Sequence, residues 1–182
     1  RASPPHLTRP DSRKGGTPQG PLRRNTMNNT PYFRALYELS GLTQREIAEF
    51  LEVNVRTVER WCSTMTPPES ALADFMRFED ELSDFVDEVI DSIDLQVEDR
   101  GEPFLILIHA YADKESYETS ELSRSSGRTF GTQWEIVKRL YCILRGNDYP
   151  VRIVGNEDGS EDHITILWRS EEEDGVLESF TY

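Results

Sequence analysis

Cysteine, histidine and long apolar runs are scarce in this sequence of 182 residues. The two cysteines, Cys62 and Cys142, lie at helical positions among apolar neighbours and lack the Cys-x-x-Cys spacing of zinc sites. No apolar run approaches the roughly 18 residues that a membrane span needs, and the polar, proline-rich start differs from a signal peptide. We therefore expect a cytoplasmic protein with reduced core cysteines, no metal and no membrane association.

Sequence patterns of catalysis are missing as well. The serines of residues 123–126 have no neighbouring histidine or nucleophile elbow, and no glycine motif that could cradle a phosphate is present. His109 lies within an apolar run and His163 opens another, which favours structural histidines. Residues 156–162 (NEDGSED) lack the terminal glutamate of a calcium loop. We predict no catalytic residues, no cofactor and no enzymatic activity.

Positive charge is also in short supply, with 20 basic against 34 acidic side chains and a net charge of −14. Residues 31–66 carry four basic and five acidic side chains, whereas residues 67–102 carry two and thirteen. Because non-specific binding to nucleic acid depends on positive charge, we expect this kind of binding to be weak for such a chain. Specific contacts to DNA would therefore come from residues 31–66, the least acidic folded segment.

The most informative stretch is TQREIAEFLEVNVRTVERWC, residues 43–62. Its apolar spacing predicts two short helices, over residues 44–51 and 55–62, joined by a tight turn with Asn54 as the N-cap of the second. On that second helix Arg56 and Arg60 stand side by side, opposite the inward-facing apolar side chains. Two arginines on a firmly held helix suit insertion into the DNA major groove.

The run G-L-T-Q-x-E-I-A-x-x-L-x-V-N-x-x-T-V-x-R-W, residues 41–61, resembles the Cro/repressor-type (XRE-like) helix-turn-helix family. That family usually has a small residue in the turn where this chain has Glu52. The pair Arg56-Thr57 before Trp61, followed by two prolines and an acidic helix, is similar to the anti-CRISPR-associated (Aca) regulators. The resemblance implies a homodimeric repressor of phages or mobile elements that binds an inverted-repeat operator and represses its own operon.

Six residues are candidates for contacts to double-stranded DNA: Arg56, Arg60, Gln44, Asn54, Val55 and Glu59. Arginine suits guanine, valine a thymine methyl group and glutamate a cytosine amino group, while Gln44 matches the family's phosphate-contacting glutamine. Several alternatives stay open: surface ion pairs of the arginines with Glu52 or Glu59, a purely capping role for Asn54, and an orienting role for Glu59. Some Aca regulators also bind RNA, but no aromatic platform for stacking bases is evident here.

We expect an α+β fold divided into four segments. Residues 1–30 form a disordered basic tail, of which 1–26 could be an upstream extension, a linker or a vector-derived remnant. Residues 31–66 form a helix-turn-helix domain whose first helix covers residues 31–40. Residues 67–100 form one long acidic amphipathic helix, and residues 101–182 a dimerisation module.

The long helix carries a wide apolar stripe that allows two interpretations. It either docks on the chain's own two domains or forms the seam of a homodimer, with the candidate dimerisation residues Leu72, Phe75, Leu82, Phe85 and Val89. Its acidic outer face is expected to be solvated.

The sequence pattern of residues 101–182 predicts a small β-α-β-β module. Residues 104–111 form a buried strand, residues 113–128 a loop with a short helical turn, and residues 133–146 an amphipathic helix. Two further strands, 149–155 and 163–169, would pair as a hairpin around Asp158-Gly159, and residues 176–180 could add an edge strand.

Two functions of other kinds compete with the repressor. The acidic helix could belong to a protein–protein interaction adaptor or a DNA mimic that engages a basic partner. The same helix pair could also serve a phage DNA-packaging or recombination accessory protein.

Overall fold

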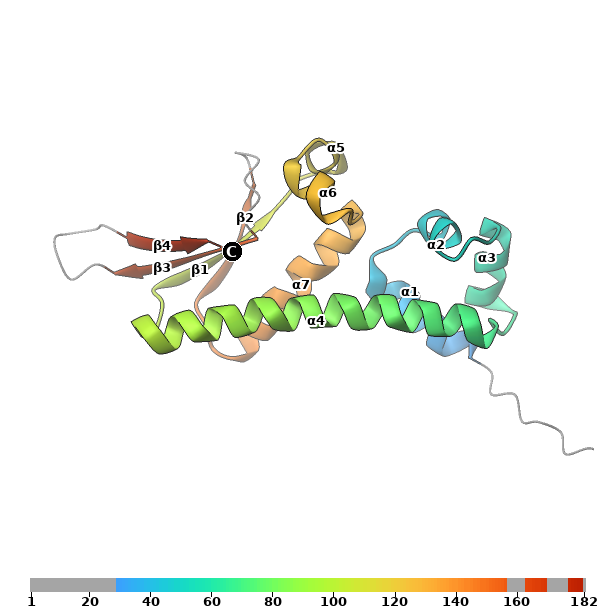
Figure 1. The fold of residues 1–182 in the computed structure, drawn as a ribbon, viewed down its shortest axis with the longest axis horizontal. Helices are drawn as coiled ribbons and strands as arrows, with labels where there is room; N and C mark the ends of the chain where they lie inside the picture. The colour runs from blue at the N-terminus through green and yellow to red at the C-terminus, as the bar shows by residue number, and fades with distance from the viewer. Residues whose placement is uncertain (1–28, 157–162, 170–176, 182) are drawn as a thin grey trace, which may run out of the picture.

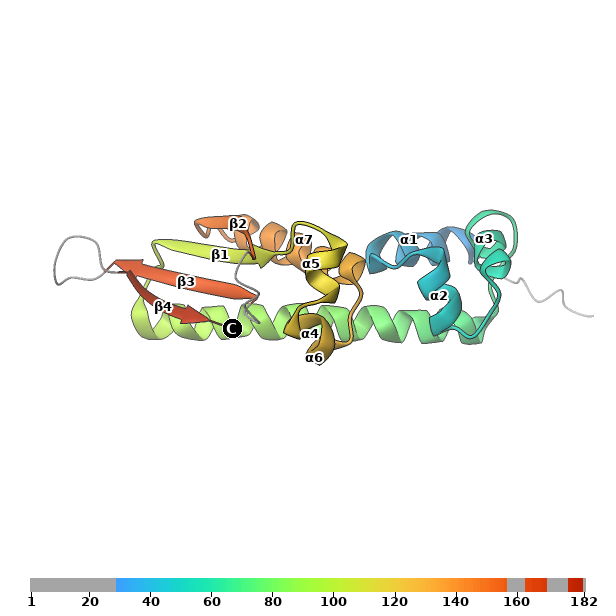
Figure 2. The ribbon, with the colours of Figure 1, turned by 90° about the horizontal axis from the view of Figure 1, so that it is seen from above.

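The computed structural model describes residues 29–156, 163–169 and 177–181, which form a mixed α+β protein. The 32-residue helix α4 (Glu69–Arg100) runs along one side of the molecule (Figures 1 and 2). Helices α2 and α3 lie at its N-terminal end, and the β-sheet lies at its C-terminal end. At a rise of about 1.5 Å per residue α4 is about 48 Å long, so these two ends are well separated.

Three helices precede α4 within a residue or two of the predicted bounds: α1 (Thr30–Ser40), α2 (Gln44–Phe50) and α3 (Val55–Ser63). Gly41 ends α1 in the left-handed region with φ of 70°. Thr43 and Glu46 form a capping box, in which the Thr43 N–H donates to Glu46 Oε2 over 2.7 Å. The local capping residues therefore set these helix ends.

The three helices and the first turns of α4 enclose one apolar core, whose largest buried members are Phe33, Leu36, Ile47, Val58, Trp61, Leu72 and Phe75. Phe33 lies at its centre, with its ring centroid 5.6 Å from that of Trp61 and 5.3 Å from that of Phe75. Burying each such aromatic side chain contributes about 2–3 kcal/mol.

The sheet has four strands in the order β2-β1-β3-β4: β2 (Val151–Gly155), β1 (Leu105–Ala110), β3 (Ile164–Arg169) and β4 (Leu177–Thr181). Strand β2 runs parallel to β1 because the chain crosses over through helix α7 (Phe130–Gly146) between them. On the other side of β1, β3 pairs with it in the antiparallel direction, and β4 pairs antiparallel with β3. The suggested edge strand is confirmed.

The predicted hairpin between β2 and β3 is wrong, because β1 lies between them and pairs with both. The short, polar, glycine-containing connection resembled a hairpin turn. The central position of β1 could not be seen in that local pattern. The proposed turn at Asp158-Gly159 lies outside the described residues.

One face of the sheet is covered by α4 and α7, which share a second core with it. From α4 this core takes Leu82, Val86, Val89 and Ile93, and from β1 it takes Ile106 and Ile108. On β1 the buried residues alternate with half-buried ones. The alternation shows that the sheet face covered by α4 and α7 holds the core of the C-terminal part of the chain.

The candidate dimer seam needs correction. Leu72, Phe75, Leu82 and Val89 are at most 8% exposed, and each belongs to one of the chain's own two cores. Phe85 packs against the second core and contacts the His163 and Arg128 side chains. The stripe therefore serves docking within the chain, the alternative that the pattern left open, and its four buried residues are not accessible to a second copy.

The segment between β1 and α7 is more ordered than predicted. It holds two short helices, α5 (Lys114–Glu118) and α6 (Glu121–Ser126), capped by Asp113 and Ser120. Tyr117, fully buried, holds them together and donates its hydroxyl hydrogen to the Arg128 carbonyl over 3.0 Å. Helix α7 begins at Phe130, three residues earlier than predicted, and Cys142 on it is exposed although it was expected in the core.

The N-terminal helices contact the C-terminal part of the chain where the C-terminus of α1 touches the first turn of α7. Thr132 Oγ1 donates to the Ser40 carbonyl over 3.1 Å in a buried hydrogen bond. Arg139 donates to the Leu39 carbonyl over 2.9 Å and pairs with Glu79 of α4 at 2.7 Å. This junction fixes the three N-terminal helices against the rest of the chain.

Candidate nucleic-acid interface

Helices α2 and α3 are joined by four residues, 51–54, whose tight turn is closed by backbone hydrogen bonds. The Val53 N–H donates to the Ala48 carbonyl over 2.8 Å, and Glu52 takes a positive φ of 53°. Glycine adopts this conformation without strain, whereas a residue with a Cβ loses about 1–2 kcal/mol. The turn thus has the tight geometry expected from its length, with Glu52 in place of a small residue.

Helix α3 is held from its inner side and from its start. Val58 is fully buried and Trp61 is 5% exposed, both in the core around Phe33. At the start, Asn54 Oδ1 accepts a hydrogen bond from the Arg56 N–H at 2.9 Å. The predicted capping role of Asn54 is confirmed, and the residue is exposed.

The outer face of α3 carries one exposed apolar side chain, Val55, and three exposed charged ones, Arg56, Glu59 and Arg60. Within the described part of the chain neither Arg56 nor Arg60 forms an ion pair, so the alternative of pairing with Glu52 or Glu59 finds no support. Elsewhere arginines do pair locally, as Arg34 does with Glu38. Two unpaired guanidinium groups on neighbouring turns can donate hydrogen bonds to an acceptor outside the chain.

Gln44 is half-buried at the first position of α2, next to the N-cap Thr43. The capping box already occupies this helix start, since the Glu46 N–H donates to Thr43 Oγ1 and the Glu46 carboxylate lies in the first turn. Figures 1 and 2 show α3 at the outer end of the molecule, where no other described element covers it. An elongated ligand such as a duplex could approach α3 without meeting the sheet.

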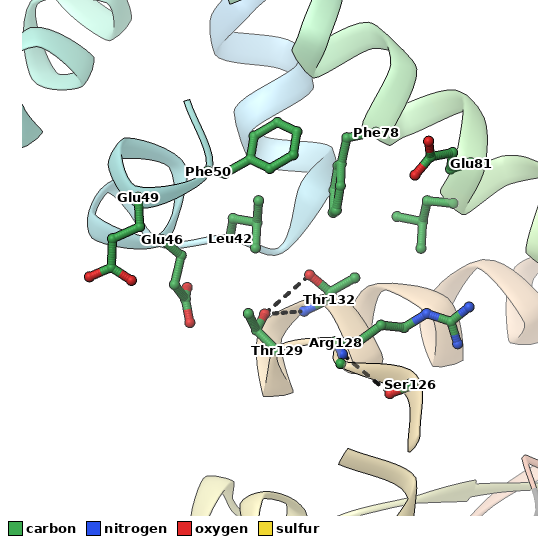
Figure 3. Close-up of a pocket in the computed structure, with 12 residues that line it drawn as sticks. Leu42, Glu46, Glu49, Phe50, Phe78, Glu81, Ser126, Arg128, Thr129 and Thr132 are labelled. Atoms are coloured by element: carbon green, nitrogen blue, oxygen red, sulfur yellow. Dashed lines mark hydrogen bonds between the residues drawn. The ribbon is translucent and has the colours of Figure 1, made fainter. Parts of the chain in front are cut away.

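Sequence reasoning missed a second feature beside α2, a cleft of about 460 Å³. It is lined by α2, by α4 and by the corner between α6 and α7 (Figure 3). No local pattern could reveal it, because its walls are brought together only by the packing of distant segments.

The described residues contain no group of three or more His, Cys, Asp or Glu arranged to hold a metal ion. His109 Nε2 lies 2.8 Å from Thr165 Oγ1, and His163 Nδ1 lies 3.2 Å from Gln133 Nε2, so both rings have polar partners within the fold. Of the described helices, none is long and apolar enough to cross a membrane.

Comparison of the sequence with protein-family models and with curated proteins finds no match. The similarity to repressors and to Aca regulators therefore remains a prediction from residues 41–61.

Proposed function

We propose that this chain is a sequence-specific double-stranded DNA-binding transcriptional repressor that uses α3 as its recognition helix in a helix-turn-helix. One observation carries the proposal: Arg56 and Arg60 are exposed and unpaired within the described chain, on a helix that Val58 and Trp61 hold in place. Because the helix backbone is already fixed and no internal ion pair has to be broken, binding to bases costs only the ordering of the two side chains, about 0.5–1.5 kcal/mol each.

The expected contacts follow from side-chain chemistry. Arg56 or Arg60 would donate two hydrogen bonds to the O6 and N7 atoms of guanine, and each such pair contributes about 1–3 kcal/mol of discrimination. Val55 could contact a thymine methyl group, and Glu59 could accept from a cytosine amino group. Gln44 would contact a backbone phosphate. With a net charge of −14, the chain depends on these specific contacts for most of its affinity.

The shape of the molecule constrains how two copies could bind one operator. Recognition helices on an inverted repeat lie about 34 Å apart. Helix α4 alone is about 48 Å long, and α3 and the sheet lie at its opposite ends. Two copies joined end to end through their sheets would therefore hold their recognition helices too far apart. A homodimer on adjacent half-sites would need contacts near α1 and the start of α4, where Tyr32, Leu39 and Met76 are 38–46% exposed.

Selection from a randomised duplex pool tests the proposal directly. The full chain should enrich one sequence, in two inverted copies if it binds as a dimer, and Arg56→Ala with Arg60→Ala should abolish the enrichment. The matched control is Arg77→Ala with Arg124→Ala, which removes two exposed positive charges on α4 and α6. Failure to enrich any sequence at low salt, or equal loss in the control, would refute the proposal. The same chain's binding to its promoter would test autorepression of the Aca type.

A second candidate function rests on the outer face of α4. Six exposed carboxylates lie there, and no ion pair neutralises them within the described residues: Asp80, Glu81, Asp84, Asp87, Glu88 and Asp91. Such a face suits a basic protein partner and would make the chain an adaptor or a DNA mimic. If the chain is an adaptor, replacing the six carboxylates by Asn or Gln should release a co-purifying protein. If it is a repressor, the same change should leave operator binding intact and only weaken the repulsion between the protein and the DNA phosphates.

A further inference from the structure

The cleft beside α2 has the size and position of a small-molecule site. Its volume of about 460 Å³ falls within the range of about 300–1,000 Å³ that is typical of ligand pockets. It lies where the N-terminal helices meet the C-terminal part of the chain, between α2, α4 and the α6–α7 corner. Such junctions are preferred positions for ligand sites.

The floor of the cleft is apolar and partly exposed to water. Phe50 is 46% exposed, and its ring centroid lies 5.5 Å from that of Phe78. Leu42 and Leu82 complete the apolar lining (Figure 3). Covering an exposed aromatic ring with another apolar group is favourable, because it removes apolar surface from water. A ring or alkyl group of a ligand would therefore be stabilised on this floor.

Two of the carboxylates that line the cleft are already engaged. Glu46 Oε2 accepts hydrogen bonds from the N–H and hydroxyl of Thr43, both at 2.7 Å. Glu49 pairs with Arg45 at 3.1 Å. Each of these two carboxylates thus has a partner within its own helix or its cap, and both keep their negative charge.

Arg128 is a half-buried cation in the cleft wall that lacks an ion pair among the described residues. Its guanidinium carbon lies 3.7 Å from the centre of the Phe85 ring, and burial lowers the pKa of the group. Its backbone is fixed, since its N–H donates to Ser126 Oγ (Figure 3) and its carbonyl accepts from the Tyr117 hydroxyl. The stacked guanidinium still has N–H donors that no described carboxylate uses.

Glu81 supplies the opposite charge. It is exposed, lines the cleft from α4, and stands one helical turn before Phe85, on which Arg128 stacks. Glu81 and Arg128 do not pair with each other, since no ion pair joins them within 4 Å. The cleft thus presents one available cation and one available anion beside an aromatic floor.

We propose that this cleft binds a small zwitterion with an apolar side chain, of the α-amino acid class. The ligand's carboxylate accepts hydrogen bonds from Arg128, its ammonium group donates to Glu81, and its side chain packs on Phe50 and Phe78. A polyphosphate or other multiply charged anion is disfavoured, because three glutamates line the same cleft. Occupation would bridge α2 to α4 and α7 and so stabilise the position of the α2–α3 pair.

Calorimetric titration of the full chain without DNA tests this inference independently of the proposed DNA binding. The probes are L-phenylalanine, phenylacetate, which lacks the ammonium group, and phenethylamine, which lacks the carboxylate. L-phenylalanine should bind with a Kd on the order of 0.1–1 mM, and each of the other two about tenfold more weakly. Arg128→Gln and Glu81→Gln should each weaken L-phenylalanine binding about tenfold, whereas Arg124→Gln and Asp87→Asn, outside the cleft, should not.

The variants also separate the role of Glu81 from that of Arg128. Glu81→Gln should leave phenylacetate binding unchanged or improved, because it removes only the partner of the ammonium group. Since Glu81 is exposed, this variant keeps the test valid even if loss of the Arg128 stacking contact destabilises the fold. Absence of binding by all three probes, equal affinity for L-phenylalanine and phenylacetate, or an unchanged affinity in Glu81→Gln would overturn the inference.

Discussion

The close contact between Gly41 and Gly131 leads to a prediction whose sign is opposite to the usual rule. Gly131 lies in the first turn of α7 and faces the C-terminus of α1. A Cβ atom on Gly131 would lie 1.9 Å from the Gly41 carbonyl oxygen. The obstructing atom belongs to the backbone and cannot rotate away, so Gly131→Ala must push α1 and α7 apart.

The size of the effect follows from three contributions. Replacing glycine by alanine in a helix normally stabilises a protein by up to about 1 kcal/mol. Forcing a methyl group into a packed contact costs about 1–3 kcal/mol. Separating the helices also weakens the buried hydrogen bond from Thr132 to the Ser40 carbonyl, at about 1 kcal/mol. Gly131→Ala should therefore lower the free energy of unfolding by about 1–3 kcal/mol.

Urea unfolding followed by circular dichroism measures this change, with Gly146→Ala as the matched control. Gly146 lies in the same helix, and a Cβ atom there would meet no atom within 4 Å. The control should be neutral or up to about 1 kcal/mol more stable than the parent chain. If Gly131→Ala matched or exceeded the parent chain in stability, the close contact between α1 and α7 would be refuted.

Three further changes should alter stability. Glu52→Gly should raise the free energy of unfolding by about 1 kcal/mol in urea titrations, because φ of 53° strains a residue with a Cβ. Arg139→Met should lower it by about 2 kcal/mol, since Glu79 keeps a mostly buried carboxylate without its ion pair; adding Glu79→Met should restore part of the loss. Burial raises the pKa of Tyr117 above its ordinary value of 10.0, so the contribution of its neutral phenol is complete below that pH and is lost as the pH rises through the raised pKa. Tyr117→Phe should flatten the decline of Tm at alkaline pH.

Each of these predictions has an outcome that would contradict it. A Glu52→Gly variant less stable than the parent chain would mean that the glutamate side chain stabilises the turn more than its φ strains it. Additive losses in Arg139→Met and Glu79→Met would show that the two groups are not coupled. An unchanged alkaline slope in Tyr117→Phe would assign that slope to other groups, such as Tyr149, whose pKa is also raised, chiefly by burial.

Local chemistry was a good guide to the helices before and including α4. Thr43, Glu46 and Asn54 carry their capping information in side chains that bond to their own neighbours, so the helix ends follow from nearby residues. The apolar period of α3 likewise predicted that Val58 and Trp61 face inward, and it left Arg56 exposed. These are interactions of short range, which a sequence pattern can express.

Tertiary structure decided where those elements lie and what covers them. The stripe of Leu72, Phe75, Leu82 and Val89 is equally apolar whether a second copy or the chain itself buries it, and only the packed fold distinguishes the two. The position of β1 between β2 and β3, the contact of Gly41 with Gly131, and the cleft near Arg128 also depend on residues far apart in sequence. The sequence by itself determined which face of α3 is exposed and carries Arg56 and Arg60. The fold added the length that separates this face from the sheet, because α4 spans both cores as one uninterrupted helix.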